Sequence, residues 1–238
     1  MNVMWFSAGV SSAAVLLMCR HEIDVAIYQH IDDQHPDTLR FLRDIESASG
    51  KPILIRQSPY KSCEGVFRAH NFVSKGHHSY KCTEILKKRE RKQWENENPG
   101  RHTYYWGMDI DEKGRTIGLA AAMPGHDHRY PLIEREMTKQ DAHGMIERLG
   151  IKRPAMYELG YHNNNCLGCV RGGMGYWNRI RVDFPDVFAQ RAKLERDIKH
   201  SFINGVYLDE LDPESGRHDP PITTECGIFC FINTGELP

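Results

Sequence analysis

The sequence predicts an α/β protein with an open, mostly parallel sheet flanked by helices, and three observations lead to this prediction. Apolar strand-like segments alternate with helix-like segments over the first two thirds of the chain. The first strand-like segment leads through a Ser/Gly turn into a helix, which is how a βαβ unit opens. With 238 residues, the chain can bury one sizeable core. We expect residues 1–160 to form that core and residues 161–238 to pack on it as a cysteine-bearing extension.

The first half of the core follows from short apolar runs separated by helical periodicity. Val3–Phe6 reads as a buried strand, and Ser11–Arg20 reads as the helix after it. Val25–Ile31 is rich in strand formers. Pro36–Ser49 carries apolar residues at helical spacing until a glycine stops it, and Pro52–Arg56 makes a third strand.

The second half of the core is more polar. The segment TEILKKRERKQWENE, residues 83–97, predicts a strongly charged helix that ends before Pro-Gly. Thr103–Met108 resumes strand character and Lys139–Leu149 resumes helix. In the extension, NNNCLGCVRGGMGYW reads as a loop and Asp186–His200 as a helix with one apolar face. Because ligands of such sheets bind beyond the carboxyl ends of the strands, the segments that follow strands are the candidate site.

Charge and cysteine content narrow the partners and the compartment. The 31 lysines and arginines nearly balance the 32 acidic residues, so no overall field points to nucleic acid or membrane. No apolar run is long enough to span a bilayer, and the N-terminus has no secretory pattern, so we expect a cytoplasmic protein with no membrane partner. Seven cysteines in such a chain fit thiol chemistry or metal binding better than structural disulfides.

The turn after the first strand reads Ser-Ala-Gly-Val-Ser-Ser, residues 7–12. It lacks the Walker sequence and the three glycines of a dinucleotide fingerprint. Gly9 allows close approach of the backbone, Ser11 and Ser12 offer hydroxyls, and a helix N-terminus favours an anion. Taken alone, the turn is as compatible with a plain connector as with an anion site.

The order of three later segments along the chain favours the anion site over the plain connector. IDDQHPDT follows the second strand, CTEILKK opens the charged helix, and GMDIDEKGR follows the fourth strand. This succession resembles the PP-loop superfamily and, within it, the adenylyl-sulfate and phosphoadenylyl-sulfate (PAPS) reductases. The resemblance implies an adenine nucleotide alpha-hydrolase-like fold and an adenine nucleotide as ligand. The positions that it matches to nucleotide binding are Ser7, Ala8, Gly9, Ser11, Ser12, Asp32, Asp33, Thr38, Gly107 and Glu112.

The resemblance extends into the C-terminal third. YELGYHNNNCLGC is similar to the family's Tyr-x-x-Gly-Tyr-x-x-x-x-Cys-x-x-Cys stretch, and ECGIFC is similar to the reductases' Glu-Cys-Gly-Leu-His tail. The likeness therefore covers nearly the whole chain. The chain departs from the superfamily at one position of the first turn. Enzymes of the superfamily that split ATP carry an acidic residue there, which helps to hold the metal ion on the triphosphate. This chain has serine at that position. That departure favours a reductase acting on an already activated sulfate.

The cysteines indicate a metal centre with an incomplete set of ligands. Cys166 and Cys169 form a C-x-x-C within a loop able to wrap a metal. Cys82 stands where cluster-containing members of the family carry a cysteine pair, and Lys81 occupies the other half of that pair. Cys230 is the candidate fourth ligand; the alternative is an iron with an open site. The metal is expected to be an iron–sulfur cluster, with zinc as the alternative.

Two roles compete for Cys226. As a reductase nucleophile, implied by the resemblance, its thiolate attacks sulfur and leaves a thiosulfonate that a thioredoxin-like thiol resolves. In the rival arrangement Cys226 and Cys230 join the C-x-x-C in a structural metal site that holds the tail to the core. The two roles exclude each other.

Each candidate anion-binding cation also has a purely structural interpretation. The run Lys87–Lys92 is typical of a solvated helix face. Within it Lys87 is the exception, because the family has a lysine near nucleotide or cluster at that position. Arg171 is a phosphate contact or part of a turn, and Arg115 is an anion contact or the partner of Glu112. We predict all three cations as anion-binding residues, with Lys87 and Arg115 beside the reaction.

Other conspicuous side chains are predicted to be structural. His126 and His128 read as a polar loop, and Cys19 and Cys63 read as structural cysteines. The aromatic residues Tyr176, Trp177 and Phe184 are expected to pack in a core.

The leading functional prediction, as the resemblance implies, is thiol-dependent reduction of PAPS or adenylyl sulfate to sulfite. One alternative is a PP-loop ATP pyrophosphatase that adenylates a substrate for sulfur transfer assisted by a metal cluster. The second alternative is a non-catalytic, metal-stabilised module that binds nucleic acid through Lys87–Lys92 and Arg179–Arg181.

Overall fold

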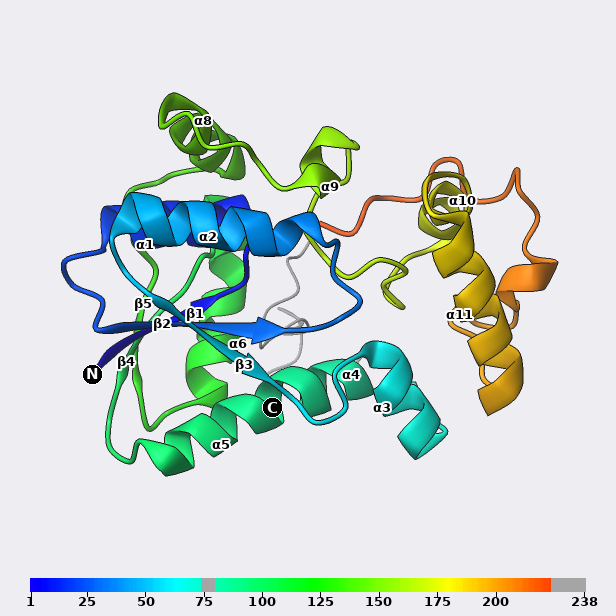
Figure 1. Ribbon diagram of the computed structural model, residues 1–238, viewed down its shortest axis with the longest axis horizontal. Coiled ribbons are helices and arrows are strands. Elements are labelled where there is room, and N and C mark those ends of the chain that lie inside the picture. Colours follow the sequence, from blue (N-terminus) through cyan, green and yellow to red (C-terminus); the bar gives the residue numbers. More distant parts are fainter. Residues whose placement is uncertain (74–79, 224–238) are drawn as a thin grey trace.

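The computed structural model describes residues 1–73 and 80–223, and within them a parallel sheet of five strands forms the centre. The strands lie in the order β3-β2-β1-β4-β5, and every neighbouring pair is parallel (Figure 1). Their bounds are β1 Asn2–Phe6, β2 Val25–His30, β3 Ile53–Gln57, β4 Thr103–Tyr105 and β5 Asp127–Arg129. The predicted α/β class with an open parallel sheet is confirmed.

Strand β1 at the centre of the sheet explains why both faces are covered. Its side chains alternate between faces: Met4 and Phe6 belong to one hydrophobic cluster, and Val3 and Trp5 belong to another. All four are buried. A strand buried on both faces reads as a continuous apolar run, which is the pattern from which it was predicted.

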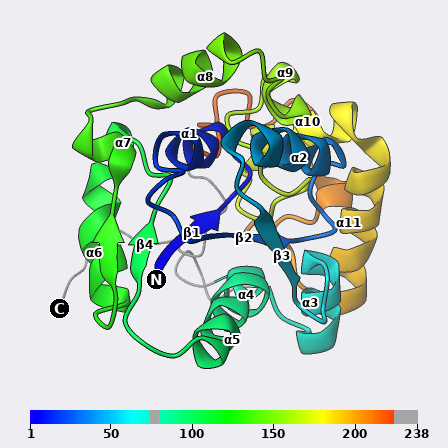
Figure 2. The same cartoon turned by 60° about the vertical axis from the view of Figure 1, so that its left-hand side comes forward.

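Helices pack on both faces of the sheet. Helix α1 (Val10–Met18) lies with α2 (Asp37–Ser49) and α8 (Lys139–Arg148) on the face of Met4, whereas α5 (Glu90–Glu97) and α6 (Thr116–Ala122) cover the face of Trp5. Figure 2 shows α1 and α2 on one side of the strands and α5 on the other. Trp94 of α5 meets the Trp5 ring edge to face at 5.7 Å, which anchors that layer.

The C-terminal segment adds a helical unit beyond the carboxyl ends of the strands. Helices α10 (Met174–Asp183) and α11 (Pro185–Ile198) pack around the fully buried Trp177, and the short helix η4 (Leu208–Glu210) joins the same cluster. In Figure 1 the arrowhead of β2 points toward the side where α10 and α11 lie. The extension therefore stands at the edge of the sheet where ligands of parallel sheets bind.

Short helices complete the connections. Their bounds are α3 Cys63–His70, α4 Lys81–Thr83, η2 Glu84–Arg89, η3 Ile110–Arg115, α7 Pro131–Glu134 and α9 Ala155–Glu158. The charged helix predicted from residue 83 is thus built from α4, η2 and α5, with η2 a π-helical segment in its middle.

Three predictions of local structure are wrong. His128 does not lie in a polar loop, because β5 pairs with β4 and His128 is opposite Tyr104, whereas His126 lies in the bend before β5. The predicted loop NNNCLGCVRGGMGYW ends early, since α10 begins at Met174 despite its glycines. Strand β4 stops at Tyr105 rather than Met108, because the chain leaves the sheet to reach Gly107 and η3.

The described helices include none that is long and apolar enough to cross a membrane.

Candidate functional site

The sheet has one topological switch point, between β1 and β4. From β1 the chain proceeds to β2 and β3 on one side, and then crosses to β4 and β5 on the other. The segments after β1 and β4 therefore diverge at this point and leave a place for a ligand between them. The turn at Ser7 follows β1, and Gly107 follows β4.

Gly107 and the start of α1 are in direct contact. A Cβ atom built on Gly107 would lie 2.6 Å from the Cα and 2.7 Å from the backbone nitrogen of Ser12. No side chain fits at such a distance without moving backbone. Glycine at residue 107 thus allows the end of β4 to approach the N-terminus of α1, and the two predicted nucleotide-binding segments meet at the switch point.

The turn itself is tightly hydrogen-bonded. Ala8 adopts a left-handed conformation with φ of 61°, which reverses the chain after β1. The Ser7 hydroxyl donates to Ser12 Oγ at 2.9 Å, and Ser12 Oγ donates to the Gly9 carbonyl at 2.9 Å. Ser7 and Gly107 are partly exposed, whereas Ala8 and Gly9 are buried. The accessible side of the turn is therefore the side shared by Ser7 and Gly107.

Ser11, in the first turn of α1, has a buried hydroxyl without a partner. Only 1 % of the residue is exposed, and within the described parts of the chain its Oγ makes no hydrogen bond. A buried hydroxyl left unpaired costs free energy, so such a group requires an explanation. A bound anion that accepts a hydrogen bond from Ser11 would supply the missing partner.

Two side chains from the C-terminal third hold the turn in place. The Tyr157 hydroxyl accepts from the backbone N–H of Val10 at 3.3 Å. Asn164 donates through Nδ2 to the Ala8 carbonyl at 2.9 Å and contacts Thr38 Oγ1 at 3.2 Å. Thr38, predicted to bind nucleotide, is buried at the start of α2 and is linked to the turn through Asn164.

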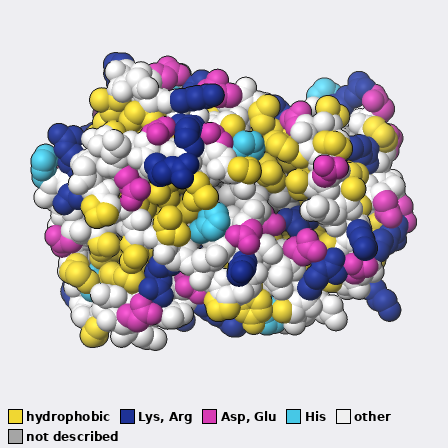
Figure 3. All heavy atoms as spheres, in the orientation of Figure 1, with side chains coloured by type: hydrophobic (Ala, Val, Ile, Leu, Met, Phe, Trp, Pro, Cys, Tyr) yellow, Lys and Arg dark blue, Asp and Glu magenta, His cyan; other side chains and the backbone are white. Residues whose placement is uncertain are grey.

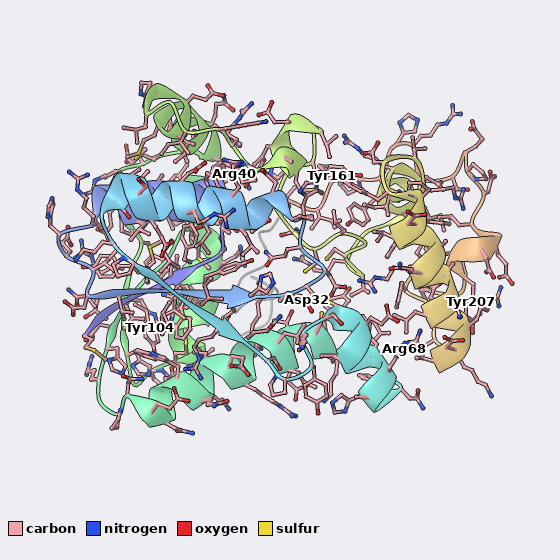
Figure 4. All side chains as sticks on the ribbon, viewed as in Figure 1. Asp32, Arg40, Arg68, Tyr104, Tyr161 and Tyr207 are labelled. Atoms are coloured by element: carbon pink, nitrogen blue, oxygen red, sulfur yellow. The ribbon has the colours of Figure 1, made fainter. Side chains whose placement is uncertain are left out.

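The neighbouring aspartates after β2 have different surroundings. Asp32 is exposed at the carboxyl end of the strand, where Gln57 Nε2 donates to its carboxylate at 2.6 Å (Figure 4). Asp33 accepts hydrogen bonds from the guanidinium of buried Arg191 and from the backbone N–H of Cys63. Asp33 therefore joins β2 to α3 and α11, whereas Asp32 is exposed at the end of β2.

Four cysteines from three segments line one small cavity. Cys63 comes from the first turn of α3, Cys82 from α4, and Cys166 and Cys169 from the loop before α10. The other residues that line it are Ile31, Tyr80, Thr83, Lys87, Val170 and Arg171. No disulfide joins the five described cysteines. The fold thus gathers the three described cysteines that were predicted as metal ligands.

Cys63 was predicted to be structural; it is buried, and it lines this cavity beside the predicted metal ligands. Its thiol contacts both Cys166 and Cys82. The Cys166 contact favours the thiolate, but the Cys82 contact and burial outweigh it, so together they raise the pKa of Cys63 well above its ordinary value. As they stand in residues 1–73 and 80–223, no three His, Cys, Asp or Glu side chains are spaced to hold a metal ion.

Lys87 and Arg171 bring positive charge to the cysteine cavity. Lys87 is only 5 % exposed and belongs to the π-helical segment η2, whose wider turn frees backbone groups. Gln29 of β2 donates to the Lys87 carbonyl at 2.7 Å and so holds this segment against the sheet. Two cations lining one cavity favour negatively charged ligands there.

Arg115 is close to its sequence neighbour Glu112. The two side chains form an ion pair within η3, and both are mostly buried. Asp109 begins this helix by accepting from the Asp111 backbone N–H at 3.2 Å. The ion pair is the plainer of the two roles considered for Arg115, and its role as an anion contact stays a prediction.

A short loop connects the cysteine cavity to the turn at Ser7. Asn164 bonds to Ala8, and Cys166 follows two residues later, so their Cα atoms are at most about 7 Å apart. A second cavity, of about 260 Å³, lies against Cys166 and is lined in part by Tyr161, His162 and Arg179. Figure 4 shows Tyr161 in the segment between the core and the C-terminal helices. Cys166 therefore stands between two cavities near the switch point.

The predicted cysteines Cys226 and Cys230 lie outside the described residues. The chain leading to them is held at Ile222, whose carbonyl accepts from Asn163 Nδ2 at 2.6 Å. Asn163 is three residues before Cys166. The point from which the chain continues toward Cys226 thus adjoins the cysteine loop.

The cations of the nucleic-acid alternative have partners within the protein. Arg91 is buried and pairs with Glu95, and Arg89 pairs with Glu84. Arg179 pairs with Asp183, and Arg181 donates to the Leu211 carbonyl at 2.7 Å. Figure 3 shows basic and acidic side chains interspersed on the visible face. Four cations of the nucleic-acid alternative thus have acidic or carbonyl partners within the protein.

Sequence reasoning missed Cys63, Asn164 and Arg191 as members of this region. For Cys63 a signal existed: Ser62 caps α3 by accepting from the Gly65 N–H at 2.9 Å, and Ser-Cys-Glu-Gly at 62–65 is a readable helix start. For Asn164 and Arg191 the sequence gives no comparable signal, because their partners lie more than a hundred residues away.

Comparison with known proteins finds similarity to solved structures only. No protein-family model matches the chain, and no curated protein matches it. Among solved structures, the chain is similar to phosphoadenylyl-sulfate (PAPS) reductase from Candida auris in its phosphate complex. The two are 14 % identical, the TM-score is 0.47, and the match covers 68 % of this chain and 79 % of the other.

Proposed function

We propose that this protein is an oxidoreductase of the PAPS reductase type, which reduces the sulfate of PAPS or adenylyl sulfate to sulfite with electrons from thiols. The observation that carries the proposal is the meeting of two features at the switch point. One is the α1 N-terminus, with Gly107 against it and the unpaired Ser11 hydroxyl within it. The other is the cysteine cavity. Cys166 lines it and follows two residues after Asn164, which bonds to the turn.

The first feature suits the nucleotide. A helix N-terminus favours negative charge, and α1 begins at the ligand-binding edge of a parallel sheet. In the proposal, Ser11 and the turn hydroxyls donate to phosphate or sulfate oxygens, and Asp32 lies beside the rest of the nucleotide. Lys87, Arg115 and Arg171 are proposed to add positive charge, with Arg115 exchanging Glu112 for the ligand.

The second feature suits sulfur chemistry. In the proposed reaction the Cys226 thiolate attacks the sulfate sulfur, forming an S–S bond while the S–O bond to the nucleotide phosphate breaks. The nucleotide leaves with the electron pair of that bond. A thiol of a thioredoxin-like partner then attacks the Cys226 sulfur, which releases sulfite with the electron pair of the S–S bond. A second thiol of the partner displaces Cys226 as a thiolate and closes a disulfide, so the two electrons that the partner's thiols lose remain in sulfite.

Cys82, Cys166 and Cys169 have the donor chemistry for an iron–sulfur cluster or zinc, and the proposal assigns them to such a centre. When bound, the centre would keep the cysteine loop in one conformation. Lys87 and Arg171 would remain beside it and hold the sulfate end of the substrate.

The test is turnover by the anaerobically purified protein. With PAPS or adenylyl sulfate and a thioredoxin system, we expect one sulfite per nucleotide released and no need for ATP. Release of AMP and pyrophosphate from ATP, with no sulfite from either activated sulfate, would instead support the adenylating sulfur-transfer alternative. Cys226→Ser should abolish sulfite formation, while Cys19→Ser, a change in the buried core, should retain it.

A further inference from the structure

We infer that Cys63 completes a four-thiolate metal site with Cys82, Cys166 and Cys169, and that Cys230 is not a ligand. The inference rests on the metal centre of the proposed function and names the ligand that the sequence left open. It replaces the two sequence-based options, Cys230 and an open coordination site.

The lining of the cavity supports this assignment. All four cysteines, and no other described cysteine, line one cavity, although Cys63 and Cys166 are more than a hundred residues apart. The Cys63 thiol already touches the thiols of Cys82 and Cys166. Structural zinc sites and iron–sulfur clusters are commonly held by four cysteines from separate segments. As they stand, no three of the described His, Cys, Asp or Glu side chains are spaced to hold a metal ion. The four cysteine side chains therefore need to rotate from mutual contact toward a common centre to bind one.

Cys63 is firmly positioned by hydrogen bonds to the segments around it. Its backbone N–H donates to Asp33, whose carboxylate also pairs with the buried Arg191. The Leu167 N–H donates to the Asp33 carbonyl at 2.8 Å, so one aspartate fixes both Cys63 and the cysteine loop. Groups of this kind, which orient ligands from behind, are typical of metal sites. A cysteine buried for packing alone would not need this arrangement.

The charges that line the cavity also match those of a four-thiolate site. Four thiolates around a zinc ion, or around a cluster with the same core charge, leave two negative charges. Lys87 and Arg171 line the same cavity and carry two positive charges. Buried charges are stable when they are paired, so the cations and the loaded site stabilise each other.

The experiment measures metal, not turnover. The full-length protein and its Cys63→Ala, Cys82→Ala, Cys230→Ala and Cys19→Ala variants are purified anaerobically, and iron, acid-labile sulfide and zinc are measured per chain with the visible spectrum. Cys19 is the matched control, since it is another buried cysteine at a helix end. We expect Cys63→Ala and Cys82→Ala to lose metal about tenfold or more. Cys19→Ala and Cys230→Ala should retain it.

A second measurement covers the case in which Cys63→Ala folds poorly. The metal-free wild-type and Cys63→Ser proteins are titrated with cobalt, whose thiolate charge-transfer absorption grows with the number of bound sulfurs. We expect a four-thiolate spectrum for the wild type and a weaker, three-thiolate spectrum for Cys63→Ser. Iron with sulfide would identify the resident centre as a cluster, and zinc alone would identify a structural ion.

Two results would overturn the inference. Full metal retention in Cys63→Ala with loss in Cys230→Ala would restore the ligand set expected from the sequence. A wild-type protein that binds neither iron nor zinc nor cobalt would remove the metal site altogether. A loaded protein that releases no sulfite would contradict only the proposed reaction and leave the four-thiolate assignment intact.

Discussion

At the scale of single residues, neighbours in the sequence have opposite roles, and composition does not reveal this. Asp32 and Asp33 are identical in type and adjacent, yet one is exposed and the other bonds to Cys63 and Arg191. Ser11 and Ser12 are also adjacent and identical in type. The Ser11 hydroxyl has no partner among the described residues, whereas the Ser12 hydroxyl donates to the Gly9 carbonyl. The sequence predicts that these residues lie at the strand ends, but which of each pair faces a ligand depends on partners from distant segments.

The aspartate pair gives the first prediction. Asp33→Ala should lower the free energy of unfolding by about 3 kcal/mol, because it leaves the buried Arg191 guanidinium with only the Glu64 contact at 3.4 Å. Asp32→Ala should cost less than about 1 kcal/mol, since its partners are at the surface. Urea unfolding of the two variants makes the comparison. Equal losses would show that the Asp33–Arg191 pair is not what joins the extension to the core.

The serine pair gives the second prediction. Ser11→Ala removes a hydroxyl that is unpaired in the protein alone, so stability should stay the same or rise by up to about 1 kcal/mol. Affinity for adenylyl sulfate or PAPS should fall about tenfold, the loss of one hydrogen bond to a charged group. Calorimetric titration and thermal unfolding measure the two effects.

Ser12→Ala is the matched control for this experiment. It loses bonds to Ser7 and to the Gly9 carbonyl, so its stability should fall by about 1 kcal/mol. Unchanged nucleotide affinity in Ser11→Ala would mean that the buried hydroxyl does not serve the ligand.

At the scale of elements, the sequence predicts what local pattern determines. The strands β1, β2 and β3 and the helices α1, α2, α8 and α11 were predicted within a few residues of their bounds, because apolar periodicity and flanking glycines define them. Strand β5 could not be read from Asp-His-Arg, since its pairing with β4 rather than its composition makes it a strand. The π-helical turn at Lys87 likewise depends on the tertiary contact from Gln29.

The contact between β4 and α1 gives the third prediction. Gly107→Ala should lower the free energy of unfolding by about 1–3 kcal/mol, because the new methyl group overlaps the backbone of Ser12 and forces the two elements apart. The same shift should weaken nucleotide binding. Gly125→Ala is the control: space around it is open, so a neutral effect is expected. A Gly107→Ala variant as stable as the wild type would contradict the close approach.

Helix α11 gives the fourth prediction, a dependence on pH. Burial raises the pKa of Glu195 to about 7, although its carboxylate accepts from the Phe202 and Leu208 N–H groups. The folded state therefore holds this proton more tightly than the unfolded state. Its contribution to stability is full at acidic pH and is lost as pH rises toward 7, by up to about 3 kcal/mol.

The measurement is the free energy of unfolding between pH 5 and 8, in steps of about one unit, for the wild type and Glu195→Gln. The glutamine cannot ionise, so the stability of the wild type relative to Glu195→Gln should fall from pH 5 to about pH 7 and level off above it. A constant difference would mean that Glu195 does not titrate there.

At the scale of the whole molecule, the extension brings cysteine chemistry to the edge of the sheet where a nucleotide is proposed to bind. Asn164 contacts the turn, Cys166 lines the cavity, and α10 and α11 support both from the far side. The sequence indicates the two parts of the candidate site separately: the Ser/Gly turn indicates the nucleotide site, and the C-x-x-C indicates the cysteine site. These two parts lie close together because parallel strands have their carboxyl ends at one edge of the sheet. The choice of Cys63 as the inferred fourth ligand depends on the fold, since the sequence does not indicate it.

The most direct test of the account traps the sulfur. Protein purified anaerobically with reduced cysteines and freed of small thiols is mixed with sulfur-labelled PAPS or adenylyl sulfate, and peptides are mapped for covalent label. The account predicts stoichiometric label on Cys226, with matching nucleotide release, and discharge of labelled sulfite when a dithiol is added. Nucleotide that binds without labelling any cysteine, or label that appears only when ATP is supplied, would contradict it.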